Sequence, residues 1–479
     1  MQESLKKKTV KGTLWSSIER FSVQGISFIV MIIMARILTP ADYGLVGMIA
    51  IFMAISQSLI DSGFSQALIR KQDRSEVDNS TVFYFNIAIG IVLYLILFFS
   101  APLIADFYKE PKLIPITRAI GLNLVFNSLA VVQRALYTIN LNFKTQAKAT
   151  LIGVVTSGTV GIWMAYSGYG VWSIVTQQLT NVGLVSICLW IFSKWRPIIA
   201  FSKESFKSLF EFGSKLLVSG LIDTIYKNLY LIVIGKVFRA SDLGYYTRAH
   251  QFTDFASSNL TGILQRVSYP VLCTIQDNDD RLADVYRRLL RVSTFIIFPL
   301  MMGLAAVATP MVITILTEKW VFAATLIVPL CFSQMWYPVH AINLNLLQVK
   351  GRSDLFLRLE IIKKIIGVII ICITIPMGLL AMCWGAVANS IIALIINTHY
   401  TGKLINLGFG KQMWDLLPIL LLSVGMGIAV WLTISLLNLS PILSLITGVG
   451  EGFIIYGSLA KILHFKEFSE LLTIIHRKA

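Results

Sequence analysis

Charged residues are scarce in this sequence. Asp, Glu, Lys and Arg make up 14% of the 479 residues, whereas an average soluble domain has about 25%. Hydrophobic residues make up 56%, and the mean hydropathy is +0.74. A soluble globule of this composition would leave large apolar areas in contact with water. The composition therefore excludes the ordinary classes of soluble enzyme and soluble binding protein.

The sequence also lacks the short motifs that carry metal or nucleotide chemistry. Its five cysteines are scattered and form no CxxC pair, so neither a disulfide framework nor a zinc site is expected. The five histidines are isolated, and neither an HExxH motif nor a GxxxxGK[ST] phosphate-binding loop occurs. We therefore predict no catalytic residues, no metal and no cofactor, and we do not expect the chain to use ATP itself.

Long apolar runs occupy most of the chain. Each has about 20 residues, enough to cross a bilayer core of roughly 30 Å as an α-helix. The sequence thus predicts an all-α, polytopic membrane protein with about fourteen spans. We place them at about 14–35, 44–66, 82–101, 114–138, 148–166, 170–192, 210–234, 247–271, 290–315, 322–348, 359–375, 378–398, 415–436 and 441–462.

The charge of the loops alternates along the chain. Loops rich in Lys and Arg, such as the one with Lys6, Lys7 and Lys8, alternate with loops that hold few charges. The positive-inside rule then places both termini in the cytoplasm, which agrees with an even number of spans. The rule also accounts for the net charge of +16, so we expect membrane lipids around the chain and no nucleic-acid partner.

One sequence element occurs twice. Residues 35–45 and 235–245 share a cation, two apolar residues, a spacer, an Asp, one further residue and a Gly, and each copy lies between two apolar runs. Six predicted spans separate the copies, so the repeat is parallel. We predict an N-terminal lobe at 1–195, a C-terminal lobe at 196–400 and two extra spans at 401–479. Such repeats are typical of transporters, whose binding site lies between the lobes.

The repeated element itself favours a structural role on the outer side of the membrane. A proline can end one helix and an aspartate can cap the next, so we expect a tight turn between the first two helices of each lobe. The turn residues are Pro40, Asp42, Gly44, Asp242 and Gly244.

Charged residues inside spans are the main candidates for function. Placing one charged side chain at the centre of a membrane helix costs roughly 2.5–3.5 kcal/mol on insertion scales. Such a residue is therefore expected to have a charged partner, to face a hydrated cavity or to serve the function of the protein. The cationic candidates for binding an anionic substrate are Arg20, Arg134, Lys215, Lys227 and Arg266. A structural alternative stays open for each: several lie near span ends and can reach the membrane surface, and Lys227 can pair with Asp223, four residues earlier.

Polar stripes complete the predicted site. Side chains at three- and four-residue steps lie on one helix face, and such stripes occur on the first two helices of each lobe. We expect these four helices to line a common hydrated cleft. Candidates for the cleft lining are Gln24, Ser219, Gln251 and Ser258, and candidates for binding a coupling H⁺ or Na⁺ are Asp61, Asp223 and Asp254.

Five segments of the sequence resemble one family of membrane proteins. They are 35–44 (ARILTPADYG), 60–64 (IDSGF), 133–136 (QRAL), 242–249 (DLGYYTRA) and 350–356 (KGRSDLF). Together they resemble the Wzx-type polysaccharide flippases of the multidrug/oligosaccharidyl-lipid/polysaccharide (MOP) superfamily, and among these the WzxC-like branch for lipopolysaccharide and colanic acid. The resemblance covers residues from about 5 to 400 and ends before the last two spans.

The resemblance implies a transporter rather than an enzyme. Its cargo would be an undecaprenyl-pyrophosphate-linked oligosaccharide, moved from the cytoplasmic to the periplasmic leaflet of a bacterial inner membrane by alternating access of two lobes. Polysaccharide polymerases or other assembly proteins are the expected partners. A multidrug or organic-cation antiporter of the same architecture stays the alternative, although its cleft should be dominated by acidic and aromatic groups. A membrane enzyme would need a sizeable loop or a cluster of carboxylates, and the sequence offers neither.

Overall fold

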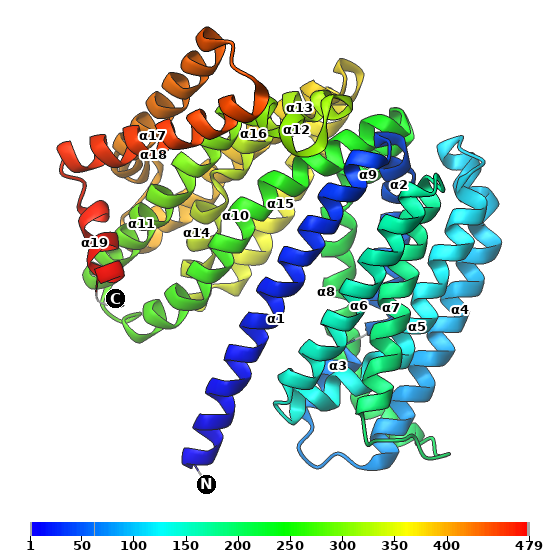
Figure 1. Cartoon of the computed structure of the whole chain (residues 1–479). Helices are drawn as coiled ribbons and strands as arrows, with labels where there is room; N and C mark the ends of the chain where they lie inside the picture. Colours follow the sequence, from blue (N-terminus) through cyan, green and yellow to red (C-terminus); the bar gives the residue numbers. More distant parts are fainter. Residues whose placement is uncertain (1, 62, 477–479) are drawn as a thin grey trace. The chain divides into compact units, whose positions relative to one another are not determined.

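The computed structural model describes residues 2–61 and 63–476, and within them all side chains except those of 2–14, 16–20, 212, 215, 216, 218, 219, 263, 266, 267, 471, 472 and 474–476. The described chain contains helices and no strand (Figure 1). The predicted all-α class is therefore confirmed. By the packing of its helices the chain divides into two compact units, Met1–Gly244 and Tyr245–Ala479, and the boundary falls inside one helix.

The first unit contains nine helices and the beginning of a tenth in its described part. They are α1 (Gln2–Ile37), α2 (Pro40–Asp61), α3 (Phe64–Arg70), α4 (Glu76–Tyr108), α5 (Leu113–Ile139), α6 (Phe143–Tyr166), α7 (Val171–Phe192), α8 (Lys203–Lys227), α9 (Leu229–Val237) and the start of α10 (Ala240–Thr274).

The second unit contains the rest of α10 and the helices that follow it. These are α11 (Asp279–Ala306), α12 (Ala308–Leu316), α13 (Val321–Gln334), α14 (Tyr337–Val349), α15 (Ser353–Thr374), α16 (Leu379–Ile405), α17 (Phe409–Leu437), α18 (Pro441–Ile462) and α19 (Lys466–His476), with two short 3₁₀ turns at Glu318–Trp320 and Ile375–Met377. The predicted lobe boundaries at 195/196 and 400/401 refer to the sequence repeat and stay a prediction.

Ten helical segments in the described residues are long and apolar enough to cross a membrane, and a shorter apolar segment covers Phe21–Ile37. The chain is therefore a multi-pass membrane protein. Each predicted span overlaps one helix or two consecutive helices, but the count of fourteen stays a prediction. Several predicted spans are interrupted. The second breaks at Gly63, which has a φ of 70° in the left-handed region that glycine adopts readily.

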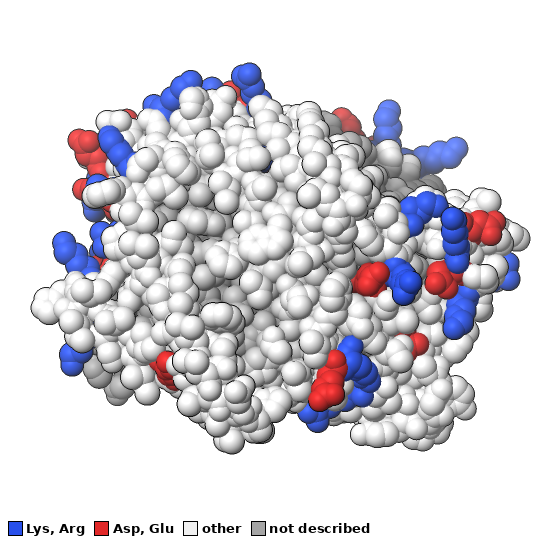
Figure 2. Space-filling model, turned by 90° about the horizontal axis from the view of Figure 1, so that it is seen from above, with Lys and Arg blue, Asp and Glu red and all other residues white. Residues whose placement is uncertain are grey.

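Apolar side chains on the surface agree with a lipid environment. Phe99 and Leu103 on α4 are 72% and 70% exposed, and Phe453 on α18 is 78% exposed. Figure 2 shows one face of the molecule, on which Lys, Arg, Asp and Glu stand in small separate groups while other residues cover most of the surface. Large apolar side chains exposed on helices of this length are expected where the neighbour is a lipid tail rather than water.

Within the first unit, α4 packs along α5, α6 along α7, and α1 along α6 (Figure 1). Small residues permit this close packing. A Cβ atom on Gly158 of α6 would lie 2.6 Å from a methyl carbon of Val30 on α1. Because lipid tails are as apolar as the helices themselves, close van der Waals contact of this kind is a main source of helix association in membranes.

Both copies of the repeated turn use their aspartate as a helix cap. The backbone N–H of Thr39 donates to Oδ2 of Asp42 at 2.9 Å, and the Thr39 hydroxyl donates to the same oxygen at 2.7 Å. In the second copy the backbone N–H of Arg239 donates to Oδ2 of Asp242 at 3.1 Å. Pro40 occupies the first position of α2, where its missing N–H costs nothing. In each turn the aspartate side chain thus satisfies the backbone N–H of the residue that precedes the helix.

The two copies of the turn also contact one another through their glycines. A Cβ atom added to Gly44 would lie 1.7 Å from the carbonyl oxygen of Ala240, and one added to Gly244 would lie 1.9 Å from the carbonyl oxygen of Pro40. The contact is reciprocal, since the glycine of each copy faces the first residue of the helix that the other copy begins. Only glycine allows the two backbones to approach this closely.

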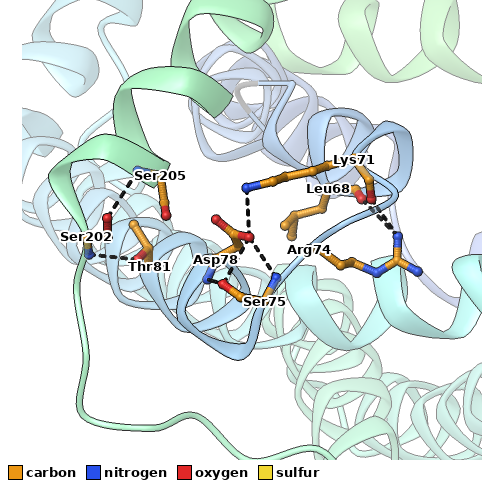
Figure 3. A network of polar contacts seen from close by, with 8 residues as sticks. All are labelled: Leu68, Lys71, Arg74, Ser75, Asp78, Thr81, Ser202 and Ser205. Carbon is orange, nitrogen blue, oxygen red and sulfur yellow. Dashed lines mark hydrogen bonds and ion pairs between the residues drawn. The ribbon is translucent and has the colours of Figure 1, made fainter.

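A second polar network fixes the start of α8 on α4 (Figure 3). Asp78 is 1% exposed, and its Oδ2 accepts from Lys71 at 2.8 Å and from the backbone N–H of Ser75 at 2.7 Å. One turn later, Thr81 accepts from the backbone N–H of Ser202 at 3.0 Å. The bond between Ser202 and Thr81 holds the segment before α8 against α4, and α8 then packs on α2 and α3.

Substitution of Gly44 by alanine should destabilise the fold strongly. The new methyl group would overlap the Ala240 carbonyl, and relief requires backbone movement, so we expect a loss of about 3 kcal/mol or more in the free energy of unfolding. Thermal unfolding of the purified protein in detergent measures the effect. Gly25→Ala is the matched control, because a Cβ there meets nothing within 4 Å. Equal melting temperatures for the two variants would contradict the reciprocal contact.

Asp78→Ala should also lower stability, because it removes a helix cap and the partner of Lys71. We expect a loss of about 1–3 kcal/mol, again from thermal unfolding in detergent. Asp73 is exposed in the same loop, so Asp73→Ala should change the melting temperature little. If both variants melt alike, the network of Figure 3 does not stabilise this end of the unit.

Candidate functional site

A polar cavity lies within the first unit among α2, α5 and α7. Its volume is about 450 Å³, which falls in the range of small-molecule binding sites. Six of its nine lining residues carry side-chain amides and the other three are apolar. The nine residues are Met53, Ala54, Gln57, Asn123, Asn127, Gln177, Gln178, Asn181 and Val182. We call this site the amide cavity.

Helical spacing brings the amides together. Asn123 and Asn127 are four residues apart on α5, and Gln177 and Asn181 are four apart on α7. Residues at this spacing lie one above the other on the same helix face. Gln57 on α2 joins them, so three helices contribute amides to one space.

A carboxylate and a guanidinium stand beside the cavity. Gln57 donates from Nε2 to Oδ1 of Asp61 at 3.3 Å, and Arg134 donates from Nη2 to Oδ1 of Asn127 at 3.5 Å. Among the described side chains, Asp61 is exposed and Arg134 is half-buried, and the two opposite charges do not form a direct ion pair. Two amides of the cavity are therefore hydrogen-bonded to side chains of opposite charge, one on α2 and one on α5.

The chemistry of the amide cavity is neutral and bifunctional. Every amide offers N–H donors and a carbonyl acceptor, and none of the nine lining residues carries a charge. Oδ1 of Asn123 is buried and has no hydrogen-bond partner among the described residues. In the described part of the chain, no three His, Cys, Asp or Glu side chains lie close enough to hold a metal ion. The cavity is thus suited to an uncharged polar ligand.

Two buried amides in the second unit, Asn343 and Gln412, bond each other. Asn343 on α14 donates to Gln412 on α17 at 3.1 Å, and the hydroxyl of Thr401 on α16 donates to Asn343 at 2.6 Å. On α14, His340 also bonds Ser390 and Asn397 at 3.1 and 3.2 Å. These buried groups find their partners in neighbouring helices and act as polar contacts that hold the helices together.

The predicted cationic residues lie in different settings. Arg134 is half-buried beside the amide cavity. Lys227 forms an ion pair with Asp223 at 2.7 Å, and the two side chains are 72% and 50% exposed. This is the arrangement expected if Lys227 has a structural role as the partner of Asp223. The predicted Arg20, Lys215 and Arg266 lie outside the described side chains.

The remaining predicted residues are spread over both units. Gln24 is half-buried on α1, and Ser219 lies outside the described side chains. In the second unit, the Ser258 hydroxyl donates to Asp254 at 3.2 Å, and Gln251 accepts from Arg248. Of the predicted set, the structure brings together Asp61 and Arg134 at one cavity. A cleft lined jointly by spans 1, 2, 7 and 8 stays a prediction.

Sequence reasoning missed most of the amide cavity. It selected charged residues in spans, whereas five of the amides stand in spans 4 and 6, which it did not single out. A signal was present: amides recur at four-residue steps inside otherwise apolar segments. These overlooked residues are Asn123, Asn127, Gln177, Gln178 and Asn181.

Comparison with known proteins gives matches over most of the chain. Residues 33–325 match the family described as polysaccharide biosynthesis protein. The chain is 24% identical over 431 residues to the teichuronic acid biosynthesis protein TuaB of Bacillus subtilis (strain 168), a match that covers 89% of each chain. It is 26% identical over 397 residues to the lipopolysaccharide biosynthesis protein WzxC of Escherichia coli (strain K12), covering 82% of this chain and 80% of WzxC.

Two solved structures share the fold. The lipid II flippase MurJ, in an inward closed conformation, matches with a TM-score of 0.74 at 12% identity and covers 94% of this chain and 99% of its own. An inward-facing multidrug resistance MATE family transporter of the MOP superfamily matches with a TM-score of 0.61 at 15% identity, covering 84% of this chain and 98% of its own.

A double-mutant cycle should detect the interaction between Asp61 and Arg134. We expect Asp61→Asn and Arg134→Ala to be non-additive, with a coupling free energy of about 1–3 kcal/mol in thermal unfolding, because both side chains bond amides of one cavity and Arg134 is half-buried. The exposed pair is the matched control: Asp223→Asn with Lys227→Ala should couple by less than about 1 kcal/mol. Additive effects at Asp61 and Arg134 would show that the two charges act independently.

Proposed function

The chain belongs to the polysaccharide biosynthesis protein family, as its sequence motifs predict, and we propose that it is a flippase for a lipid-linked oligosaccharide. It binds the sugar-bearing head group at the cytoplasmic leaflet and releases it at the outer leaflet by alternating access. This makes the protein a transporter rather than an enzyme. The cargo is an undecaprenyl-pyrophosphate-linked repeat unit, and the membrane is a bacterial inner membrane with both termini of the chain in the cytoplasm.

The observation that carries the proposal is the amide cavity inside a membrane-spanning unit. A sugar hydroxyl moved into hydrocarbon without a hydrogen bond costs several kcal/mol, so an oligosaccharide cannot cross unaided. Uncharged amides on three helices supply such bonds. Relatives named for teichuronic acid and lipopolysaccharide biosynthesis, and a shared fold with a lipid II flippase, support a sugar-bearing lipid as the cargo.

The charged part of the cargo requires cations. A pyrophosphate in a low-dielectric cleft is stabilised by guanidinium and ammonium groups. We assign this role to the predicted set of Arg20, Arg134, Lys215, Lys227 and Arg266. Arg134 has the strongest support, since it lies beside the amide cavity.

An ion gradient is the proposed source of energy. Exchange of H⁺ or Na⁺ at a carboxylate can bias two conformations of a transporter. The candidates remain Asp61, Asp223 and Asp254, and we favour Asp61 because its charge interacts with Arg134. Protonation of Asp61 would remove its attraction for Arg134 and leave the guanidinium available to the head group. Polysaccharide polymerases or other assembly proteins stay the expected partners.

A multidrug or organic-cation antiporter is the second candidate, and the shared fold with a MATE family transporter favours it. A cationic drug is best bound by carboxylates and aromatic faces. The nine residues that line the amide cavity include neither, and the one carboxylate beside it, Asp61, is balanced by Arg134, so the flippase is the better supported function.

Reconstitution tests the proposed function directly. Vesicles containing the protein should move a fluorescent undecaprenyl-pyrophosphate-linked oligosaccharide between leaflets, measured by a membrane-impermeant quencher, faster than protein-free vesicles. Arg134→Ala should slow transfer by about tenfold to 150-fold, since a lost charge-assisted hydrogen bond is worth about 1.5–3 kcal/mol.

Arg118→Ala is the matched control for Arg134→Ala. Arg118 lies on the same helix and stacks over the ring of Phe98 at 4.3 Å, and it does not line the amide cavity. Its replacement should leave the rate of transfer close to that of the wild type. Equal rates in protein-containing and protein-free vesicles would exclude the flippase function. Uptake of an organic cation by the same vesicles would favour the antiporter instead.

A further inference from the structure

We propose that the amide cavity is a subsite for a neutral, hydroxyl-bearing sugar of the cargo, separate from the cations that hold its charged anchor. This inference rests on the proposed function, because it assigns one part of the proposed cargo to one part of the chain. Its basis is the residue type, the hydrogen bonding and the placement of the six amides that line the cavity.

The lining selects against charged ligands of either sign. An anion such as phosphate accepts hydrogen bonds, so it would face the carbonyl oxygens of the amides with no cation among the nine lining residues to offset them. A cation would need carboxylates or aromatic faces, which the lining also lacks. A sugar hydroxyl both donates and accepts, and a side-chain amide offers both functions.

Internal hydrogen bonds hold three of the amides in defined orientations. Gln57 uses its Nε2 on Asp61, and Asn181 uses its Nδ2 on Ser157 at 3.2 Å, so each leaves its carbonyl oxygen for a ligand. Asn127 is held in the opposite sense, because its Oδ1 accepts from Arg134 and its NH₂ group is left. The cavity therefore presents fixed acceptors from α2 and α7 and a fixed donor from α5.

The other amides have hydrogen-bonding capacity to spare. The Oδ1 of Asn123 has no partner in the described part of the chain. Asn343 and Gln412 in the second unit, by contrast, satisfy one another. A buried amide without a partner costs about 1–3 kcal/mol. A ligand that supplies hydroxyl groups removes that cost, which gives the cavity an affinity for sugars.

The position of Arg134 indicates that two parts of the cargo are recognised by different groups. Its guanidinium contacts the edge of the cavity at Asn127 and does not line the cavity. The cation is therefore hydrogen-bonded to a residue that lines the sugar subsite. Such proximity is required because the pyrophosphate is linked directly to the first sugar. The anchor is recognised by charge, and the sugar next to it by fixed amides.

Native mass spectrometry of the detergent-purified protein tests the inference without requiring transport. The probes are the lipid-linked oligosaccharide fraction extracted from source cells that lack this protein, and sugar-free undecaprenyl pyrophosphate at equal concentration. The wild type should bind the glycosylated lipid in preference to the sugar-free lipid. Asn123→Leu and Gln177→Met, which keep side-chain size but remove the amide, should each reduce that preference about tenfold and leave binding of the sugar-free lipid unchanged.

Asn86→Leu is the matched control. Asn86 is fully buried on α4 and outside the cavity lining, so its replacement should leave the preference intact. The inference is overturned if the wild type shows no preference for the glycosylated lipid or if the cavity variants keep that preference. It is also overturned if the variants weaken the binding of both lipids equally. Each of these outcomes is distinct from a failure of the proposed function, because that failure appears as absent leaflet transfer in vesicles whatever the binding result.

Discussion

The bilayer core offers no water to polar groups, and the described structure follows from this constraint. Several of its polar groups are satisfied internally: Asp42 and Asp242 accept hydrogen bonds at the start of helices, Asp78 pairs with Lys71, and Asn343 pairs with Gln412. The amide cavity differs from these paired groups because amides from three helices converge there and Oδ1 of Asn123 has no hydrogen-bond partner among the described residues. Uncharged polar side chains gathered in one pocket are costly to keep in a hydrocarbon environment, so this pocket is the natural place to look for the cargo.

Hydropathy alone predicted the helical architecture well, since an apolar run of about 20 residues has few alternatives in a membrane. It could not predict where helices break. The run at 44–66 is interrupted at Gly63, and the run at 210–234 at Asn228, because a hydropathy average is insensitive to a single residue whose backbone leaves the helix. For the same reason, the number of complete spans cannot be obtained from composition.

The site was harder to predict than the fold. Asp61 and Arg134 were identified because a charge in a span is conspicuous, and the structure places them at one cavity. Asn123 and Gln177 were not, since isolated amides in a helix usually serve packing, and only the arrangement of three helices shows that they converge. The exposed pair of Asp223 and Lys227 illustrates the opposite case, in which two conspicuous charges are each other's partners.

The reciprocal contact of Gly44 with Ala240, and of Gly244 with Pro40, ties the two copies of the duplicated turn together. A side chain at one position is tolerated only if the backbone of the other copy withdraws, so neither copy can drift independently of its counterpart. The two halves of the gene are therefore expected to coevolve at this point. A chimera that joins one half of this chain to the opposite half of a distant relative would have to inherit both turns from the same parent.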